Sequence, residues 1–448
     1  MTTPLSQTTF FNHLKDIFSP KVLVRMHLDK AYLFKLFVRN AGRFNWKNEG
    51  NGYVVKMRLS HGASFQAHVR GQALPQGHGA VRVSTKWLPK TYVGNVPIAY
   101  EDYRELKTDK GKIASFVESF TDLVKDSIEG TKEHLETRLF LGRSTPLAQL
   151  YATSPVTEVS AGVYTVRLAN SSGFKSFGMT QIVELVTVSG NTNTLSENNT
   201  GTNKISNNLL VTRHYKSEGG YYVRLESQGT NTITPANYSG SHYVTGAKSS
   251  SYYDIYGLQD ICNDTLTLPG QNTCDSGFTT EIGVDPLAYF QVQPLLRNME
   301  NAVFTIASVL DTTKQILVDD HFASFEDMII ITNQYTADLY AAECRTNRTF
   351  PGTMRNEDMG LKAITYDGRP IIVLRRTPAG NLYMIDPTHI GLCTMAGSDF
   401  RWLQDDAGIK MSLDRATTTL NMDWMFRPQL VTDDRHPQCR VYGIKQTA

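Results

Sequence analysis

The most regular pattern of apolar and polar residues lies between residues 112 and 141. Apolar side chains recur there every three or four positions, at Ile113, Phe116, Val117, Phe120, Val124, Ile128, Leu135 and Leu139. This spacing is the repeat of one face of an α-helix. Gly142 follows and suits the left-handed position that ends a helix. About thirty residues at 1.5 Å each form a rod of roughly 45 Å, so the sequence predicts a long helical strut.

The opposite side of this predicted helix carries carboxylates at steps of three and four residues: Glu118, Asp122, Asp126, Glu129, Glu133 and Glu136. These steps place all of them within a stripe roughly 80° wide. Like charges at this spacing repel one another and weaken the helix that carries them. A solvated face and a basic partner both account for the stripe, so the pattern alone leaves the two interpretations open.

Before the helix, apolar and polar residues alternate with the period of a β-strand over residues 53–59, 65–70 and 80–87. A turn signal at residues 49–52 and a Gly- and Pro-containing tip at residues 71–79 separate these runs. The basic residues of this segment are Lys56, Arg58, Arg70, Arg82, Lys86 and Lys90. The sequence predicts a long basic hairpin, too polar on both faces to be buried, which rests on another surface because an isolated hairpin is marginally stable. Another strand is expected at residues 91–101, with Pro97 marking an edge or a bend.

Charge is divided unevenly along the chain. Residues 1–90 hold 14 Lys and Arg against three Asp and Glu, whereas the remaining residues hold 31 against 40. Pro4 and Pro20 interrupt the basic first segment, which we interpret as an extended arm. A basic front and an acid-striped helix indicate that one part of the molecule lies on another.

Composition changes near residue 155. Up to about residue 280 the chain is rich in Asn, Thr, Ser, Gly and Tyr, with alternating runs at residues 163–168, 181–188, 208–214, 221–225 and 252–256. Turn residues separate these runs at intervals typical of a β-sandwich or a small barrel. The tyrosines of this region suit half-buried strand positions, and a ligand-binding surface is the alternative, for Tyr221, Tyr222, Tyr243, Tyr252 and Tyr253.

From residue 286 the pattern is that of an α/β domain. Helices are predicted at residues 301–322 and 334–345. Strands are predicted at residues 327–332, 361–366, 370–375, 381–385, 390–395, 409–413, 417–425 and 440–444. Asp367-Gly368 is a strong signal for a two-residue hairpin turn.

A search for catalytic or metal-binding motifs finds none. The chain has no P-loop, no HExxH, no GxSxG and no strand-linked GxGxxG. Its five cysteines are odd in number and scattered without a CxxC, which favours reduced thiols. The acid- and His-containing segments 319–321 and 433–436 are interpreted as solvated surface, because adjacent residues point in different directions. We therefore expect no enzyme activity and no cofactor.

Membrane insertion is not expected either. The chain has no run of eighteen apolar residues, which is the length that a transmembrane helix needs. Its first twenty residues also lack a basic stretch followed by a continuous apolar one, so no secretory signal is visible.

The order of these parts resembles the tailed-bacteriophage major capsid protein family, whose Hong Kong 97-like shell fold is shared with encapsulins. In that family an N-terminal arm leads to an extended hairpin, the E-loop, and then to a long spine helix in the peripheral domain. An axial domain follows, and the chain returns to complete the peripheral domain. The segments that most resemble axial elements are DMIIITNQYTADLY (327–340), YDGRPIIV (366–373) and NLYMIDPTHI (381–390).

The resemblance implies an α+β chain with an inserted β-rich domain. Its expected parts are the arm at 1–48, the E-loop hairpin and flanking strand at 49–101, the peripheral domain at 102–154 with the spine helix at 112–141, the inserted β-rich domain at 155–284, the axial domain at 285–398 and the C-terminal part of the peripheral domain at 399–448. In such shells the E-loop crosses a neighbour's peripheral domain. We therefore expect the six basic residues of the hairpin to contact the six carboxylates of the neighbour's stripe.

The resemblance also implies partners and a location. It implies assembly with copies of itself into pentamers and hexamers of an icosahedral virion capsid, which forms in the bacterial host cytoplasm and encloses double-stranded DNA without sequence preference. No long charged helical segment precedes the arm, so a separate scaffolding protein is expected, together with a portal and a possible decoration protein. The alternatives are an encapsulin-type compartment with protein cargo and, in another class, a secreted β-rich carbohydrate-binding or adhesin protein.

Overall fold

The basic hairpin forms one of several sheets in the computed structural model. The residues that the structure describes are 32–41, 46–49, 52–58, 82–99, 131, 134–142, 147–169, 177, 181–189, 192–195, 209–217, 220–227, 235–246, 255–262, 292–321, 323–346, 353–356, 361–374, 376–394, 401–402, 404–405, 408–409, 411–414 and 419–445. The hairpin sheet is antiparallel and consists of β1 (Trp46–Glu49), β2 (Gly52–Arg58) and β3 (Arg82–Trp87). Of the strands predicted here, residues 65–70 lie outside the described residues.

One face of this sheet is buried inside the subunit. Tyr53, Val55 and Trp87 are each at most 1% exposed and belong to a large apolar core. The expectation that both faces are too polar to be buried is therefore wrong for the base of the hairpin. Because side chains alternate along a strand, each second residue of β2 and β3 points to the core, whatever the polarity of the residues between.

The predicted spine helix is described at Thr131 and over residues 134–141, where it is helical. It ends at Gly142, as the sequence predicts: this residue has φ +71°, and its N–H donates to Arg138 O at 2.7 Å. That single bond is one of the standard left-handed endings of a helix. The helix end abuts a short helix, α7 (Leu258–Ile261), whose Asp260 lies against Gly142.

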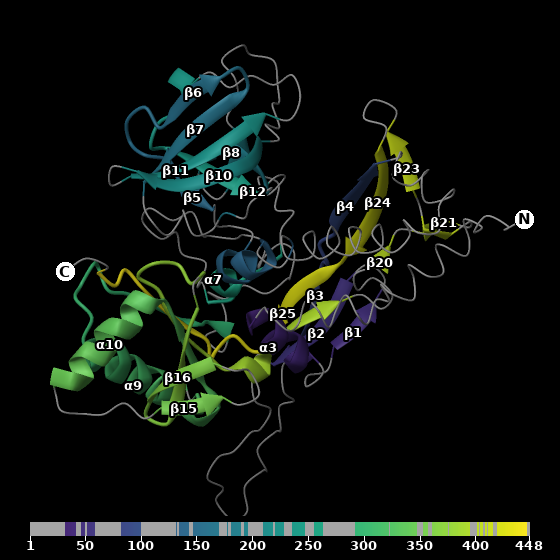
Figure 1. Cartoon of the computed structure of the whole chain (residues 1–448). Helices are drawn as coiled ribbons and strands as arrows, with labels where there is room; N and C mark the ends of the chain where they lie inside the picture. Colours follow the sequence, from purple (N-terminus) through teal and green to yellow (C-terminus); the bar gives the residue numbers. More distant parts are fainter. Residues whose placement is uncertain are drawn as a thin grey trace, which may run out of the picture.

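The inserted segment forms a small antiparallel β-barrel. Its strands, in spatial order, are β5 (Ala148–Gln149), β12 (His242–Gly246), β8 (Ile182–Ser189), β10 (Leu209–Ser217), β11 (Gly220–Ser227), β7 (Val163–Leu168) and β6 (Val156–Ser160), with β9 (Thr192–Leu195) beside β8. Leu150, just after β5, bridges to Leu168 of β7, and Tyr151 N–H donates to Arg167 O at 3.0 Å. This contact closes the sheet on itself. The prediction of a sandwich or small barrel is thus resolved as a barrel, seen at the upper left of Figure 1.

Alternate residues of the barrel strands fill its interior. Tyr164, Val166 and Leu168 of β7, together with Val223 and Leu225 of β11, are at most 2% exposed and belong to one separate core. A turn carries a 3-10 helix, η1 (Pro235–Asn237), before β12. Since this core is distinct from the one beneath the hairpin, the barrel has the internal packing of a domain.

The axial part is a mixed sheet of seven strands with helices packed on it. In spatial order the strands are β13 (Leu295–Asn298), β26 (Cys439–Tyr442), β18 (Leu382–Ile385), β14 (Ile329–Thr332), β17 (Arg369–Val373), β16 (Leu361–Tyr366) and β15 (Thr353–Asn356). The helical elements are η4 (Ile306–Asp311, a π-helix), α9 (Thr312–Asp319), η5 (Phe325–Asp327) and α10 (Gln334–Thr346). Figure 1 shows α9 and α10 with these strands at the lower left. The last strand, β26, lies in this sheet, so the expected domain limit at residue 398 does not coincide with a sheet boundary.

Two details of the axial part follow from backbone conformation. β16 and β17 pair with Tyr366 opposite Arg369, and Asp367 and Gly368 between them have φ +47° and +74°. This confirms the predicted Asp-Gly hairpin turn. The helix predicted from residue 301 begins only at Ile306, because residues 299–302 form a tight turn that is hydrogen-bonded to the chain after β26.

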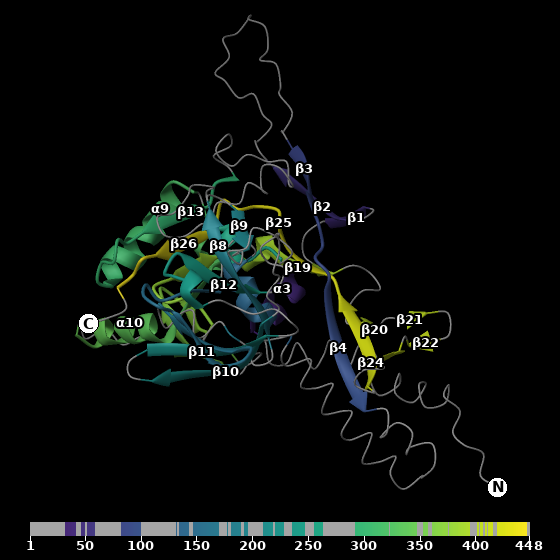
Figure 2. The ribbon, with the colours of Figure 1, turned by 90° about the horizontal axis from the view of Figure 1, so that it is seen from above.

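A ribbon built on two long strands extends from the axial part and belongs to a four-stranded sheet. Its main strands are β4 (Tyr92–Ala99) and β24 (Thr419–Phe426), which pair over their whole length. The shorter strands around it are β20 (Arg401–Trp402), β21 (Gln404–Asp405), β22 (Gly408–Ile409), β23 (Met411–Asp414), β19 (Ile390–Thr394) and β25 (Pro428–Thr432). β19 and β25 pair with each other at the base of the ribbon. Figure 2 shows β4 and β24 side by side and projecting away from the sheets.

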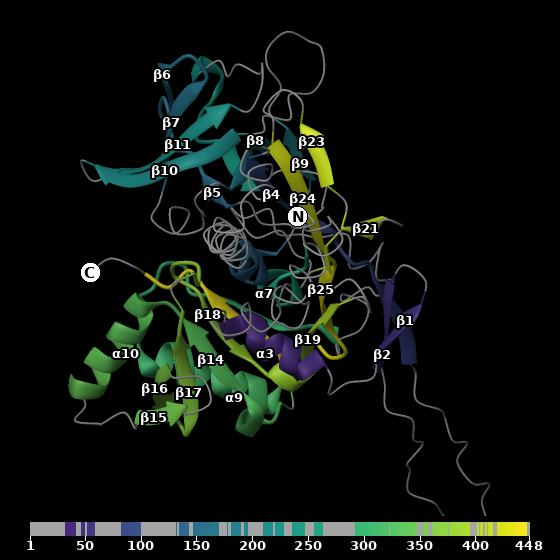
Figure 3. The same cartoon turned by 45° about the vertical axis from the view of Figure 1, so that its right-hand side comes forward.

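The basic arm contributes a helix to the centre of the molecule. α3 (Tyr32–Ala41) buries Leu33, Phe34 and Phe37 on one face. The core around them also includes residues of the hairpin, the spine-helix end, α7, the axial sheet and β19, β24 and β25. Figure 3 shows α3 beside β18 and β19. The arm is therefore a packed element over these residues.

We predict that Gly142→Ala destabilises the protein more than Gly368→Ala. Both glycines have a positive φ, which costs an alanine about 1 kcal/mol. A Cβ on Gly142 would in addition lie 1.7 Å from Asp260 Oδ2, whereas a Cβ on Gly368 would meet no atom within 4 Å. Relief of that overlap adds about 1–3 kcal/mol. Urea unfolding followed by circular dichroism measures both losses, and equal losses would contradict the close packing of the helix end on α7.

Candidate functional site

One face of the hairpin carries its positive charge. The side chains of Lys56, Arg82 and Lys86 are exposed, and Arg58 occupies the register position directly opposite Arg82. Since residues alternate between the two faces of a strand, these four positions belong to the face that points away from the core. We call these four residues the basic face.

The buried side of the hairpin fixes the orientation of the basic face. Thr85 is fully buried, and its Oγ1 donates to Val55 O at 3.0 Å while it accepts from Trp87 Nε1 at 3.0 Å. Tyr53 Oη donates to Arg427 O at 3.0 Å. A slip of one residue in either strand would bury the basic residues and expose this aromatic face, so the register is strongly specified.

The structure describes only some of the residues that are predicted to make the contact. Lys90 follows β3 and is half-buried, and its N–H donates to Pro428 O at 3.2 Å. The predicted residues that lie outside the described part of the chain are Arg70, Glu118, Asp122, Asp126, Glu129 and Glu133. The four residues of the basic face are thus brought together as predicted, and their contact with the acidic stripe stays a prediction.

Glu136, the last carboxylate of the stripe, contacts its own subunit. Its Oε1 accepts a hydrogen bond from Leu33 N–H at 3.4 Å, in the first turn of α3, and its Oε2 is buried. Burial raises the pKa of this carboxyl to about 7, while the bonds to the α3 backbone and the charge of Arg376 oppose the shift. A carboxylate at this position is favoured by the first N–H groups and the dipole of the helix. We therefore leave Glu136 out of the proposed contact with a neighbour.

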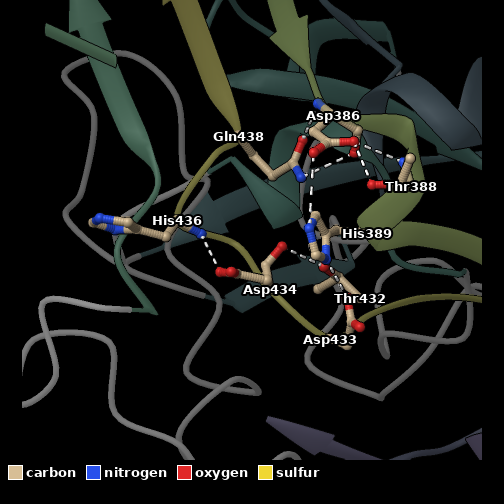
Figure 4. A network of polar contacts seen from close by, with 8 residues as sticks. All are labelled: Asp386, Thr388, His389, Thr432, Asp433, Asp434, His436 and Gln438. Carbon is tan, nitrogen blue, oxygen red and sulfur yellow. Dashed lines mark hydrogen bonds and ion pairs between the residues drawn. The ribbon is translucent and has the colours of Figure 1, made fainter. Parts of the chain in front are cut away.

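A second group of polar side chains fastens the ribbon to the axial sheet. The chain passes between the two parts at two crossovers, the 386–389 segment between β18 and β19 and the 433–438 segment between β25 and β26. Asp386 N–H donates to Gln438 Oε1 at 3.1 Å, and Gln438 Nε2 donates to Asp386 O at 3.2 Å. Figure 4 shows these residues facing each other across the two crossovers.

An ion pair joins the same two segments. His389, at the end of the 3-10 helix η6 (Pro387–His389), lies with Nδ1 2.9 Å from Asp433 Oδ1 and with Nε2 3.7 Å from Asp386 Oδ2. The hydrogen bond to Asp433 and the charges of the nearby aspartates raise the pKa of His389 to about 9, although burial opposes them. His389 is therefore an imidazolium at neutral pH, held between two carboxylates.

The 433–438 crossover has two further attachments. Arg435 is fully buried, and it donates from Nε to Ile261 O at 2.8 Å and from Nη2 to Asp260 O at 3.3 Å, at the end of α7. The ring of His436 contacts that of His321 in a tilted arrangement, and His321, which follows α9, is only 7% exposed. The interpretation of segments 319–321 and 433–436 as solvated surface is therefore wrong for His321, Arg435 and His436. The sequence holds no signal for this contact, because the two histidines are 115 positions apart.

These contacts are structural in character. Among the described residues, no three His, Cys, Asp or Glu side chains are grouped so that they could hold a metal ion. The cysteines of the described ranges, Cys262, Cys344, Cys393 and Cys439, are all buried free thiols. In the same part of the chain, no helix has the length and apolar content needed to cross a membrane.

Comparison with known proteins places the fold. No protein-family model matches the chain, and no curated protein does. Among solved structures, the cyanophage A-1(L) capsid asymmetric unit matches with a TM-score of 0.50 and 11% identity, over 93% of each chain. The SrpI encapsulin of Synechococcus elongatus (TM-score 0.41, 10% identity, 94% of this chain and 92% of that one) and the satellite phage P4 procapsid (0.39, 9%, 98% of each) are also similar. The chain has the α+β shell fold of tailed-phage major capsid proteins.

We predict that the urea midpoint falls as pH rises from about 6.5 through about 9, and that Asp433→Asn flattens this dependence. The pKa of His389 is raised above its unfolded value of about 6.5, so its contribution is fully present below that pH and is lost as pH passes 9. The variant removes the main cause of the shift and should be less stable at pH 7. Asp319→Asn, at an exposed acid, is the control. An unchanged slope in Asp433→Asn would contradict the ion pair.

Proposed function

We propose that this chain is the major capsid protein of a tailed bacteriophage, a structural protein that assembles with copies of itself into a closed icosahedral shell. One observation supports this most: the shell fold extends over 93% of the chain and is matched over 93% of a phage capsid chain. A fold alone does not fix a function, so the basic face supplies the second support. Its side chains at Lys56, Arg82 and Lys86 are exposed, and the strands that carry them are held in a fixed register.

The proposal extends to assembly and contents. The subunits form pentamers and hexamers, a separate scaffolding protein guides them, and the finished virion shell takes a portal and a possible decoration protein. The shell forms in the bacterial host cytoplasm and encloses double-stranded DNA. The resemblance of the part order supports these steps, and the low identity to the matched capsid leaves them as proposals.

The contact between subunits is proposed to be electrostatic at the hairpin. The basic face of one subunit lies on Glu118, Asp122, Asp126, Glu129 and Glu133 of a neighbour. An exposed ion pair contributes only about 0–1 kcal/mol, and salt weakens it. Each subunit would make several such pairs, and the shell repeats them in every copy, so small contributions accumulate.

We predict that the full-length purified protein forms closed shells tens of nanometres wide in negative-stain electron microscopy. Nuclease-resistant double-stranded DNA in shells from infected cells would support the virion assignment. Shells that enclose protein and no nucleic acid would instead indicate a cargo compartment. Monomers that persist under all conditions of salt and concentration would contradict a shell function altogether.

We predict that the double variant Arg82→Glu, Lys86→Glu lowers the yield of shells and their resistance to salt. Reversal places negative charges against the neighbour's carboxylates, and like charges repel. Adding Asp122→Lys and Asp126→Lys to the same chain should restore part of the yield. Shell yield after gradient sedimentation is the measurement.

The matched control for charge reversal is Arg213→Glu with Lys216→Glu on β10. These two residues are also exposed, and their reversal changes the net charge by the same amount. This control should assemble like the unmodified chain. Equal loss of shells in both double variants would show that net charge, rather than the basic face, governs assembly.

A further inference from the structure

The paired histidines His321 and His436 join the ribbon crossover to the axial helix α9. The ring centroids of His321 and His436 are 4.5 Å apart, with an angle of 35° between the planes. His321 follows α9 directly, and His436 lies within the 433–438 crossover. The pair thus lies where a segment that leaves the ribbon reaches the axial part.

The hydrogen bonds of the pair fix the position of one proton on each ring. His321 Nδ1 is 3.0 Å from His436 O, and His436 Nδ1 is 3.2 Å from Gln293 O. A carbonyl oxygen only accepts, so each Nδ1 must carry the proton and donate. The second proton of an imidazolium is carried by Nε2, so protonation leaves these bonds in place and acts on the pair through its charge.

Charging the pair is unfavourable in this position. His321 is only 7% exposed, and burial together with the charge of His436 lowers its pKa. Two imidazolium rings at 4.5 Å would repel each other where little solvent screens them. The charges that face the pair come from Asp320 beside His321 and from Asp434, which accepts from His436 N–H at 2.9 Å.

The remaining charged groups around the crossover are Arg435, bonded to the end of α7, and the His389 ion pair with Asp433 and Asp386 on η6. His389 is already an imidazolium at neutral pH and stays one in mild acid. The attachment to η6 therefore persists under conditions in which the attachment to α9 is weakened.

We propose that the His321–His436 pair is an acid-sensitive latch, whose protonation releases the 433–438 crossover from the end of α9 while the His389 ion pair keeps it on η6. The release loosens the ribbon relative to the axial sheet on one side only. It gives the subunit a hinge that responds to a fall in pH, and it requires neither assembly nor a bound partner.

The sign of the effect follows from linkage. A histidine whose pKa is lower in the folded state contributes stability above its unfolded value of about 6.5 and loses it as pH falls through the folded value. Asp434 works in the opposite sense, because burial raises the pKa of its carboxyl and protonation is favoured in the folded state. It offsets part of the stability that is lost as pH falls, so the net dependence of stability on pH is shallower than that of His321 alone.

Hydrogen exchange on the full-length protein tests the latch. The amide of His436 is bonded to Asp434, and that of Gln438 to Arg435 O at 3.0 Å, so peptides that cover the crossover report its attachment. After correction for intrinsic exchange, their protection should fall at least tenfold between about pH 7.5 and about pH 5.0. Histidine C2–H exchange on the same samples gives the pKa of His321, and the two midpoints should coincide.

The variant His321→Asn separates charge from contact. Its amide nitrogen can donate to His436 O as Nδ1 does, and it cannot become charged. Crossover protection in this variant should stay flat over the same pH range, while His242→Asn in the barrel should keep the pH dependence of the unmodified chain.

Two results would overturn the proposal. One is constant protection of the crossover in the unmodified protein between pH 7.5 and 5.0. The other is a loss of protection whose midpoint lies more than one pH unit from the titration of His321. Both measurements are made on the unmodified chain, so they test the latch even if His321→Asn fails to fold. Failure to form shells leaves this test unaffected.

Discussion

The rest of the structure depends on one apolar core that is shared by segments far apart in the chain. The α3 helix, the hairpin base, the spine-helix end, α7, the axial sheet and the ribbon all contribute residues to it. The three-stranded hairpin sheet and the four-stranded sheet of the ribbon are single layers, and each needs another surface to cover its apolar face. Their order therefore depends on residues such as Trp87 and Trp424, which they insert into this shared core. The barrel differs, because it fills its own interior.

Polar contacts supply the directional geometry that the shared apolar core lacks. Apolar packing is non-directional and allows two surfaces to slide, whereas hydrogen bonds and ion pairs have preferred geometry. The crossovers between ribbon and axial sheet are held by such directional contacts. Gln438 forms hydrogen bonds with the backbone of Asp386, and Arg435 donates hydrogen bonds to carbonyl groups of α7. Buried charges are weak sources of stability and good sources of specificity. We infer that these contacts set the angle between ribbon and sheet as well as fastening the two parts.

Local signals in the sequence predicted the elements well. Gly142 ends the spine helix with a positive φ, and Asp367-Gly368 turns a two-residue hairpin, because each depends only on the conformation of its own residues. Strands with strict alternation, such as β7, coincide with their predicted limits. β13, β25 and β12 were not predicted, since their short runs become strands only through distant partners such as β26, β19 and β8.

Contacts between distant residues were out of reach of the sequence. Glu136 belongs to the acidic pattern by spacing, yet α3 covers it. The residue pattern of the spine helix gives no information on where the arm packs. The sequence neighbours of His321 and His436 indicate a solvated surface for both. In the fold, the ring of each histidine instead packs against the ring of the other. The basic face could be foreseen, because alternation alone separates the two sides of a strand.

The register of the hairpin carries a physical argument about its partner. Arg58 and Arg82 occupy directly opposed positions, and like charges placed opposite one another destabilise a strand pair. The buried face holds the strands in this register regardless, so the two basic positions stay opposed in the isolated subunit. In the contact that we propose, carboxylates of a neighbour laid on the basic face would relieve this repulsion, and the relief would be available only on contact. The charge pattern would then oppose the isolated hairpin and favour the docked one.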